Sequence, residues 1–430
     1  MRLGRSLLVG VASAGILAGA TGGAQAGAFG LRSQSTIAIG QAYAGAAAGA
    51  AGVSSAFWNP ATLTMHPGFQ SEYNITYVDA YARITPTLPT PTIGFGGSGD
   101  VAQDAAVPAT YSSRQLTDRI WVGIASAAPF GSVTKPNVNW AGQTYSRSSR
   151  IVSLSFAPLV AYKVNDWLSI GAGPVVQYFK VRLNTALGPL PGAGNAILEG
   201  DDWAAGGTVG VTVTPTPGTV IGVGYRSTID HSLTGTFRNP AVGVVPIRVK
   251  VSLPDQLTFG VTQAITPDFR LSAAFEWMNW SRLRAPAIRA DATGTAIGSF
   301  PLNYKDGYLV SLGGEYQWNP QLALRAGVGY EWSPMDASNR STRLPDTDRV
   351  HASVGASYAW NDKLTLNASY AHYFAVGNKR IAIAPGNPLY NGAIPFFGDV
   401  QADVNLVSFS ARYRWDDPKV AEPAPIIRKY

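Results

Sequence analysis

The segment "LALRAGVGYEW" at residues 322–332 alternates between apolar and polar or small residues. Every second residue from Leu322 to Trp332 is apolar, whereas the residues between them are Arg325, Glu331 and small side chains. Alternate residues of a β-strand point to opposite faces, so one face of this strand is apolar and the other is polar. Such a strand is typical of a membrane barrel, with lipid on one side and a polar lumen on the other.

The same alternation recurs in fourteen segments that are each long enough to cross a membrane as a tilted strand. They are 69–81, 105–115, 119–130, 149–164, 167–183, 202–214, 219–236, 247–265, 268–282, 304–318, 321–332, 347–360, 363–376 and 400–415. Short connections such as "VNDW" 164–167 alternate with long ones such as 131–148, as in outer-membrane barrels. The sequence therefore predicts an all-β protein, a transmembrane antiparallel β-barrel of about 14 strands over residues 67–415.

The two ends of the chain do not fit the barrel pattern. Residues 1–26 have two early arginines, an apolar run and a small-residue end, which predicts a secretory signal peptide. Residues 27–66 are rich in Gly and Ala without a period of two, so we expect an N-terminal hatch, or plug, inside the lumen. Residues 416–430 form a Pro-rich C-terminal tail.

Composition limits the possible functions. The chain has no cysteine, which excludes thiolate catalysis, and we expect no metal and no cofactor. Loss of Arg2 and Arg5 with the leader lowers the formal net charge from +7 to +5. This mild excess without a basic cluster argues against nucleic acid as a partner.

Two other classes of barrel are alternatives. A general porin needs a wide, charged lumen and no plug. An outer-membrane hydrolase needs a Ser, His and acid group, for which the chain offers only four histidines, among them His351 two residues from Ser353. We assign no catalytic residue and expect no enzyme.

Glu315 and Arg325 lie on inward faces of consecutive strands and are predicted to form an ion pair, with Glu276 and Glu331 as further partners.

Several segments together resemble the FadL-type outer-membrane transporters (OMPP1/FadL/TodX) of long-chain fatty acids, whose relatives import aromatic hydrocarbons. The segments are "GQAYAGAAAGAAGVSSAFWNPATLT" 40–64, "VSLPDQLTFGV" 251–261, "EWMNWSRL" 276–283, "YKDGYLVSLGGEYQWNPQLALRAGVGYEWSP" 304–334 and "LPDTDRVHASVGASYAW" 344–360. The resemblance implies passive uptake of hydrophobic molecules, above all long-chain fatty acids, with aromatic hydrocarbons as the alternative. It places the protein in the bacterial outer membrane, as a monomer whose partners are membrane lipids and the barrel assembly machinery.

The resemblance also implies a lateral gate. Asn59, Pro60 and Ala61 would end the hatch at a wall strand that is kinked to open sideways, at Pro129, Phe130 and Gly131. A proline cannot donate to a strand ladder, which is consistent with a kink. The residues alone also allow a proline that merely ends the strand, and an Asn-Pro pair that is a simple turn. The second triplet, Asn239-Pro240-Ala241, is interpreted as turn chemistry.

Substrate sites are expected at two levels. The apolar loops 185–198 and 237–246, with Leu187, Leu190, Phe237 and Val244, would form an outer capture groove by resemblance, and exposed apolar patches mark binding sites. In "GPVVQYFKVRLN" 173–184, Tyr178, Lys180 and Arg182 share one face, which we predict to point into the lumen. The two cations would hold a fatty acid carboxylate, although lumen arginines also serve structural roles.

Overall fold

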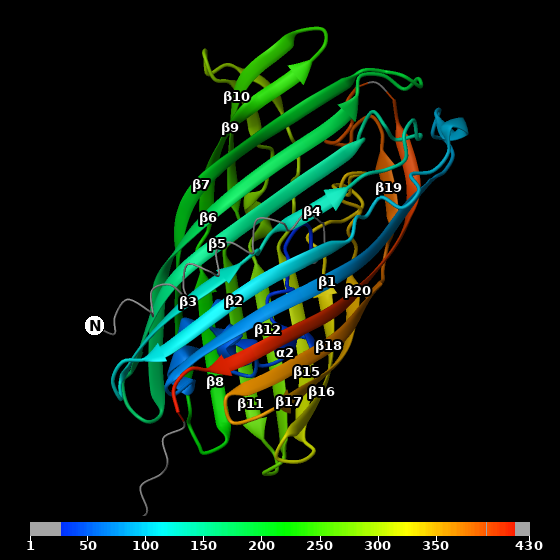
Figure 1. Cartoon of the computed structure of the whole chain (residues 1–430). Helices are drawn as coiled ribbons and strands as arrows, with labels where there is room; N and C mark the ends of the chain where they lie inside the picture. Colours follow the sequence, from blue (N-terminus) through cyan, green and yellow to red (C-terminus); the bar gives the residue numbers. More distant parts are fainter. Residues whose placement is uncertain (1–26, 393, 418–430) are drawn as a thin grey trace, which may run out of the picture.

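The computed structural model describes residues 27–417 except residue 393. The predicted signal peptide and nearly all of the predicted tail lie outside these residues. The strands form one closed antiparallel barrel of fourteen crossings, as the sequence predicted (Figure 1). Among the described residues, no helix is long and apolar enough to span a membrane.

Eleven crossings are single strands, and the other three are each interrupted once. The single crossings include β1 (Phe69–Pro86), β2 (Ala105–Gln115), β5 (Ser148–Lys163), β6 (Leu168–Ala186), β7 (Asn195–Val213), β12 (Phe269–Met278), β15 (Gly307–Gln317), β16 (Leu322–Trp332), β17 (Arg349–Ala359), β18 (Leu364–Ala375) and β20 (Phe396–Arg414). Three crossings are each built from two consecutive strands: β3 (Ile120–Ala127) with β4 (Gly131–Thr134), β8 (Thr219–Arg226) with β9 (Ile229–Asn239), and β10 (Gly243–Leu253) with β11 (Gln256–Ala264). Pairing of β1 with β20 closes the barrel.

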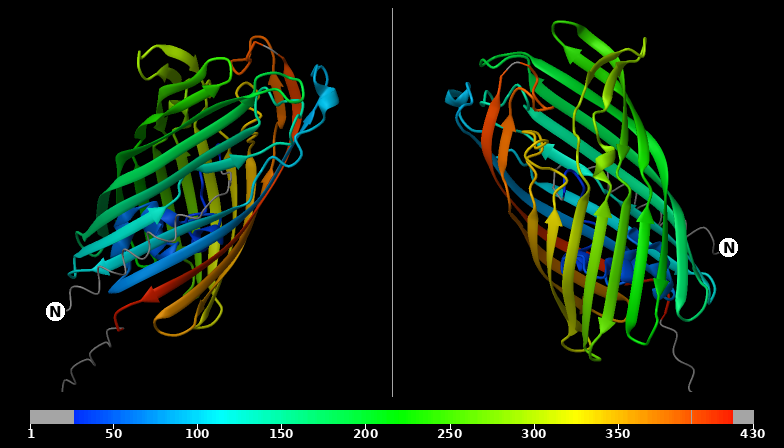
Figure 2. Two further views of the ribbon diagram at one scale, coloured as in Figure 1. Left: turned by 45° about the horizontal axis from the view of Figure 1, so that its top comes forward. Right: turned by 180° about the vertical axis from the view of Figure 1, so that it is seen from behind.

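Short strands and helices complete the structure. β13 (Ala287–Ala290), β14 (Ala296–Ser299) and β19 (Arg380–Ile383) extend the wall above the crossings. The helices are α2 (Thr36–Ile39) and the 3-10 turns η2 (Ala46–Ala48), η3 (Gly52–Phe57), η4 (Pro60–Met65), η5 (Ile93–Phe95) and η6 (Trp280–Arg282). Figures 1 and 2 show α2 to η4, in blue, inside the half of the barrel that is nearer the short turns.

The faces of the strands follow the alternation. In β16 the apolar set is outward, with Val328 57% exposed, whereas Glu331 is 1% exposed inside. Trp318 and Trp360, beside the short turns, are both 64% exposed, as expected for an interfacial aromatic girdle. Glu315 and Arg325 are directly opposite on β15 and β16, and their predicted ion pair is formed at 2.6 Å.

Candidate functional site

The hatch packs on the inner wall where the strands carry inward-facing glycines. A Cβ atom on Gly222 of β8 would lie 1.9 Å from the carbonyl oxygen of Ala47, and one on Gly224 would lie 1.8 Å from that of Trp58. No other residue type leaves room for backbone at this distance. The small residues of the hatch and the glycines of the wall are therefore complementary.

Asn59, Pro60 and Ala61 fix the end of the hatch to β6 and β7. The Asn59 side chain accepts a hydrogen bond from the Ala61 N–H and so caps η4, with Pro60 in the first turn. Its Nδ2 donates to the carbonyl of Val211 in β7 at 2.8 Å. Asn239 accepts from the Ala241 N–H in the same way, but in an exposed hairpin turn. The two triplets share local geometry and differ in what surrounds them.

A buried charge network holds the first residues of the hatch. Arg32 pairs with Glu276 at 2.7 Å and also with Glu331, which in turn contacts His351 at 3.0 Å. Glu276 and Glu331 were predicted to extend the Glu315–Arg325 pair, and this prediction was wrong. They compensate the charge of the hatch instead, because buried charges need partners.

The wall is interrupted between β3 and β4. The β2–β3 ladder ends at the pair of Thr110 and Ser126, and β4 pairs only with β5 among the described strands. Residues 105–109 of β2 therefore pair with β1 on one side and have no described ladder partner on the side of β3 and β4. At the break, the N–H of Leu31 donates to the carbonyl of Pro129, and the N–H of Gly131 donates to that of Phe29, both at 2.8 Å. The segment Phe29 to Leu31 of the hatch therefore replaces a wall strand at the kink.

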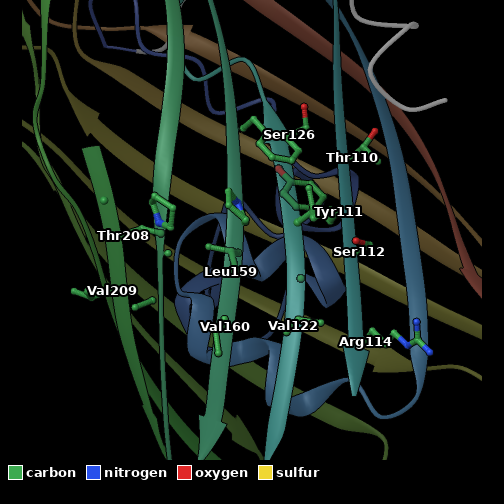
Figure 3. A pocket seen from close by; sticks show the side chains of 18 of the residues that line it. Thr110, Tyr111, Ser112, Arg114, Val122, Ser126, Leu159, Val160, Thr208 and Val209 are labelled. Atoms are coloured by element: carbon green, nitrogen blue, oxygen red, sulfur yellow. The ribbon is translucent and has the colours of Figure 1, made fainter. Parts of the chain in front are cut away.

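A hollow of about 1240 Å³ lies in the wall over β1–β3 and β5–β8. Figure 3 shows Thr110 and Ser126, the last pair of the β2–β3 ladder, on its border. Its lining is mostly apolar and includes Val122, Val160 and Val209. A hydrophobic molecule can therefore lie against the barrel at the level of the break.

A second, internal cavity lies on the extracellular side of the hatch. It has a volume of about 100 Å³, and its apolar lining includes Phe29, Phe179, Leu233 and Phe300. The Phe29 ring is 6.2 Å from the Phe179 ring and 6.0 Å from the Phe130 ring at the kink. Phe29 therefore separates the internal cavity from the break in the wall.

One cation borders this cavity. Arg343, in the loop between β16 and β17, donates hydrogen bonds to Ser149 Oγ and to the carbonyls of Ser148 and Asn184, and lies 5.8 Å from the centre of the Phe300 ring. Burial lowers the pKa of the Arg343 guanidinium to about 10, so it stays charged at neutral pH. Among the described residues no carboxylate pairs with it. The cavity thus combines apolar walls with an uncompensated positive charge.

The sequence profile of the outer membrane protein transport protein family (OMPP1/FadL/TodX) matches residues 17–415. The chain belongs to this family. It is accordingly an outer-membrane transport protein for hydrophobic compounds, and not an enzyme.

Relatives of this FadL/TodX-family protein are named after different substrates. A long-chain fatty acid transport protein of Salmonella typhi is 24% identical, over 76% of this chain and 82% of its own. The structure of a Pseudomonas aeruginosa FadL homologue matches with a TM-score of 0.81 at 21% identity, over 90% of this chain and 100% of the other. The Ralstonia pickettii toluene transporter TbuX matches with a TM-score of 0.66 at 19% identity, over 90% and 99%. The structural matches establish the fold alone.

Three predicted substrate residues of this FadL/TodX-family protein point outward and not into the lumen. Tyr178, Lys180 and Arg182 share the parity of Ile170, which is 44% exposed on the outer surface of β6. The inward set contains Phe179, which is 1% exposed and lines the cavity. The prediction that the two cations point into the lumen was wrong. Above the lipid band the outer surface is polar, so a polar face there does not mean a lumen face.

The predicted capture loops lie next to each other but do not share one face. A Cβ on Gly194 would be 3.6 Å from Pro240, so the loop 187–194 adjoins the β9–β10 turn. Leu187, Leu190 and Val244 are exposed, by 47%, 66% and 63%. Phe237 packs partly buried on the apolar cluster around the cavity, opposite Val245 on the neighbouring strand.

The residues that sequence reasoning missed all act through distant contacts. The prediction coupled Asn59 to the kink at Pro129, but Asn59 holds β7, and the hydrogen bonds to the kink come from Phe29 and Leu31. No local pattern marks Phe29 or Arg343. The sequence of β6 did contain a signal for the orientation of Lys180 and Arg182. The apolar residue Ile170 lies on the same face of the strand, and this face is the outer one.

Proposed function

We propose that this protein takes up long-chain fatty acids by passive passage across the outer membrane. The observation that carries this proposal is Arg343, a buried cation without a carboxylate partner among the described residues, at the edge of an apolar cavity. A fatty acid supplies both missing parts, an apolar chain and a carboxylate. An aromatic hydrocarbon supplies only the first.

The carboxylate would bind to the guanidinium of Arg343. Burying a cation without a counter-ion is unfavourable, and hydrogen bonds to neutral carbonyls compensate only part of the cost. An arginine can donate two parallel hydrogen bonds to one carboxylate. The Phe300 ring beside Arg343 and the apolar residues around it exclude water, which strengthens the attraction.

The acyl chain would enter the apolar cavity toward Phe29. The cavity of about 100 Å³ is smaller than the roughly 150 Å³ that hold one benzene molecule. A long chain therefore needs side chains to move apart. Phe29 is placed for this movement, because its ring borders the cavity and its carbonyl accepts a hydrogen bond from the kink residue Gly131.

Release would follow through the break between β3 and β4. The void between hatch and kink is about 30 Å³, the volume of one water molecule, so the segment 29–31 must shift to let a chain pass. Exit into the wall hollow keeps the chain out of water, which favours this route by about 0.8 kcal/mol per CH₂. The apolar loops with Leu187, Leu190, Phe237 and Val244 would collect substrate outside.

The aromatic alternative rests on the rings of Phe29, Phe130, Phe179 and Trp280, which cluster at the base of the cavity. The two functions differ in the need for a carboxylate. Binding of palmitic acid, its methyl ester and toluene to the purified protein separates them. Fatty acid transport predicts that the acid binds at least tenfold more tightly than the ester. Equal binding of acid and ester, or preference for toluene, would assign the cavity to neutral molecules.

Uptake should need no energy source, because the chain contains no nucleotide-binding motif. Outer-membrane vesicles without inner membrane provide the test. Accumulation of labelled palmitate in such vesicles is expected, and a strict dependence on a proton gradient would contradict passive transport.

A further inference from the structure

The outer surface above the apolar band carries a concentration of cations on one flank. Figure 1 shows this flank as the upper parts of β5, β6, β7, β9 and β10. The outward cations are Arg150, Lys180, Arg182, Arg238, Arg248, Lys250 and Arg289, which we call the basic face. The outward carboxylates among them are Glu199, Asp201, Asp230 and Asp291. The basic face therefore keeps an excess of positive charge.

The position of the basic face relative to the membrane follows from its aromatic residues. On β6 the outward series runs from Ile170 through Val176 to Tyr178, and continues directly with Lys180 and Arg182. The Tyr178 ring packs 5.3 Å from Trp203, which is 61% exposed. Exposed Tyr and Trp rings mark the boundary between hydrocarbon and headgroups. Lys180 and Arg182 thus begin at the level of the outer-leaflet headgroups.

Two pairs of arginines face each other across neighbouring strands. Arg150 of β5 is directly opposite Arg182 of β6, and Arg248 of β10 is directly opposite Arg289 of β13. Like charges in directly opposite positions destabilise a sheet. Arg182 reaches Glu199 at 3.4 Å and Arg248 reaches Asp291 at 2.9 Å, so each pair still holds more positive than negative charge. An external anion bound between the arginines would remove this repulsion.

The cations do not belong to a uniformly basic rim. At the corresponding height on β1 and β20, the outward positions carry Asp79, Asp399 and Asp403. The Asp79 side chain accepts a hydrogen bond from Asn405, and Arg83 is the cation on that part of β1. The charge is thus separated between two flanks of one barrel.

We propose that the basic face binds the phosphorylated headgroup of an outer-leaflet glycolipid, lipid A. Arginine binds phosphate through two parallel hydrogen bonds, and a headgroup with two phosphates matches a surface with spaced arginine pairs. The acyl chains of the same lipid would lie on the apolar outer surface of β5 and β6, below Tyr178. The inference is independent of what the lumen transports.

Titration of the full-length protein in detergent with bisphosphorylated lipid A, followed by native mass spectrometry, tests this. Each cation near a lipid surface contributes about fivefold to the binding of an anionic lipid, so R150Q/R182Q should bind about 30-fold more weakly. R150K/R182K keeps the charge and should stay within about tenfold of the native protein. R119Q/R270Q, which removes two exposed arginines at the opposite end of the barrel, is the matched control and should bind as the native protein does.

Two further probes decide between ligands. Lipid A without phosphates should bind the native protein no better than it binds R150Q/R182Q. Inorganic phosphate should not compete at concentrations that saturate with lipid A. Equal affinity for the dephosphorylated lipid, an equal loss in R119Q/R270Q, or full competition by inorganic phosphate would each overturn the proposal. Heat-modifiable migration on gels confirms that each variant is a folded barrel.

Discussion

Replacing Arg343 by glutamine should weaken the binding of palmitate to this protein. The guanidinium is the one cation in the lining of the internal cavity, and it has no carboxylate partner within residues 27–417 as described. A hydrogen bond to a charged group contributes about 1.5 to 3 kcal/mol. The loss predicts an affinity about 10- to 150-fold lower.

The assay is displacement of a fluorescent fatty acid from the purified protein by palmitate. Palmitate methyl ester should bind the native protein and R343Q with similar affinity, because the ester cannot use the charge. R147Q is the matched control, since Arg147 bonds to the carbonyl of Ala193 in a neighbouring loop and is absent from the cavity lining.

Arg343 also holds the carbonyls of Ser148 and Asn184, so its loss can disturb the loops around the cavity. R343K keeps the charge and separates the two effects, with an expected affinity closer to the native value. Unchanged palmitate binding in R343Q would refute the assignment. So would native protein that binds the methyl ester as tightly as the acid.

Four other outcomes are expected. Palmitate binding should be constant from pH 7 to 9, because Arg343 keeps its proton below its pKa of about 10, and should fall below about pH 5 as the carboxylate is protonated; a flat profile in acid would contradict the ion pair. The double variant P129V/G131V should restore pairing at the wall break and abolish uptake into vesicles while outer capture persists, so native uptake rates would argue against lateral release. G224A should displace the hatch and raise ion conductance in planar bilayers, whereas G207A, where a Cβ would meet nothing closer than 3.8 Å, should not; equal conductance in both would contradict the close approach. Deleting residues 27–58 should leave a conducting barrel of lower stability, since Glu276 and Glu331 lose Arg32, and a variant that fails to insert would show that the hatch is needed for folding.

The barrel could be predicted from the alternation of residues along the chain, because each crossing has to face lipid on one side and the lumen on the other. The alternation in β16 therefore predicted the exposed Val328 and the buried Glu331 correctly. The ion pair of Glu315 and Arg325 was also predictable, since short turns fix the register of neighbouring strands.

Which residues form the site could not be predicted from the chain and depends on contacts in the folded protein. Within the bilayer the apolar face of a strand points to lipid and the polar face to the lumen. Above the bilayer the outer surface is polar and the side that faces the cavity is apolar, so Lys180 and Arg182 were assigned to the wrong face. The key side chains of the site contact groups that are far away in the sequence, and this holds for Arg32, Phe29 and Arg343. Arg32 and Glu331, for example, are separated by about three hundred residues. Such contacts depend on how the hatch and the loops fold back into the lumen, and no local periodicity records that.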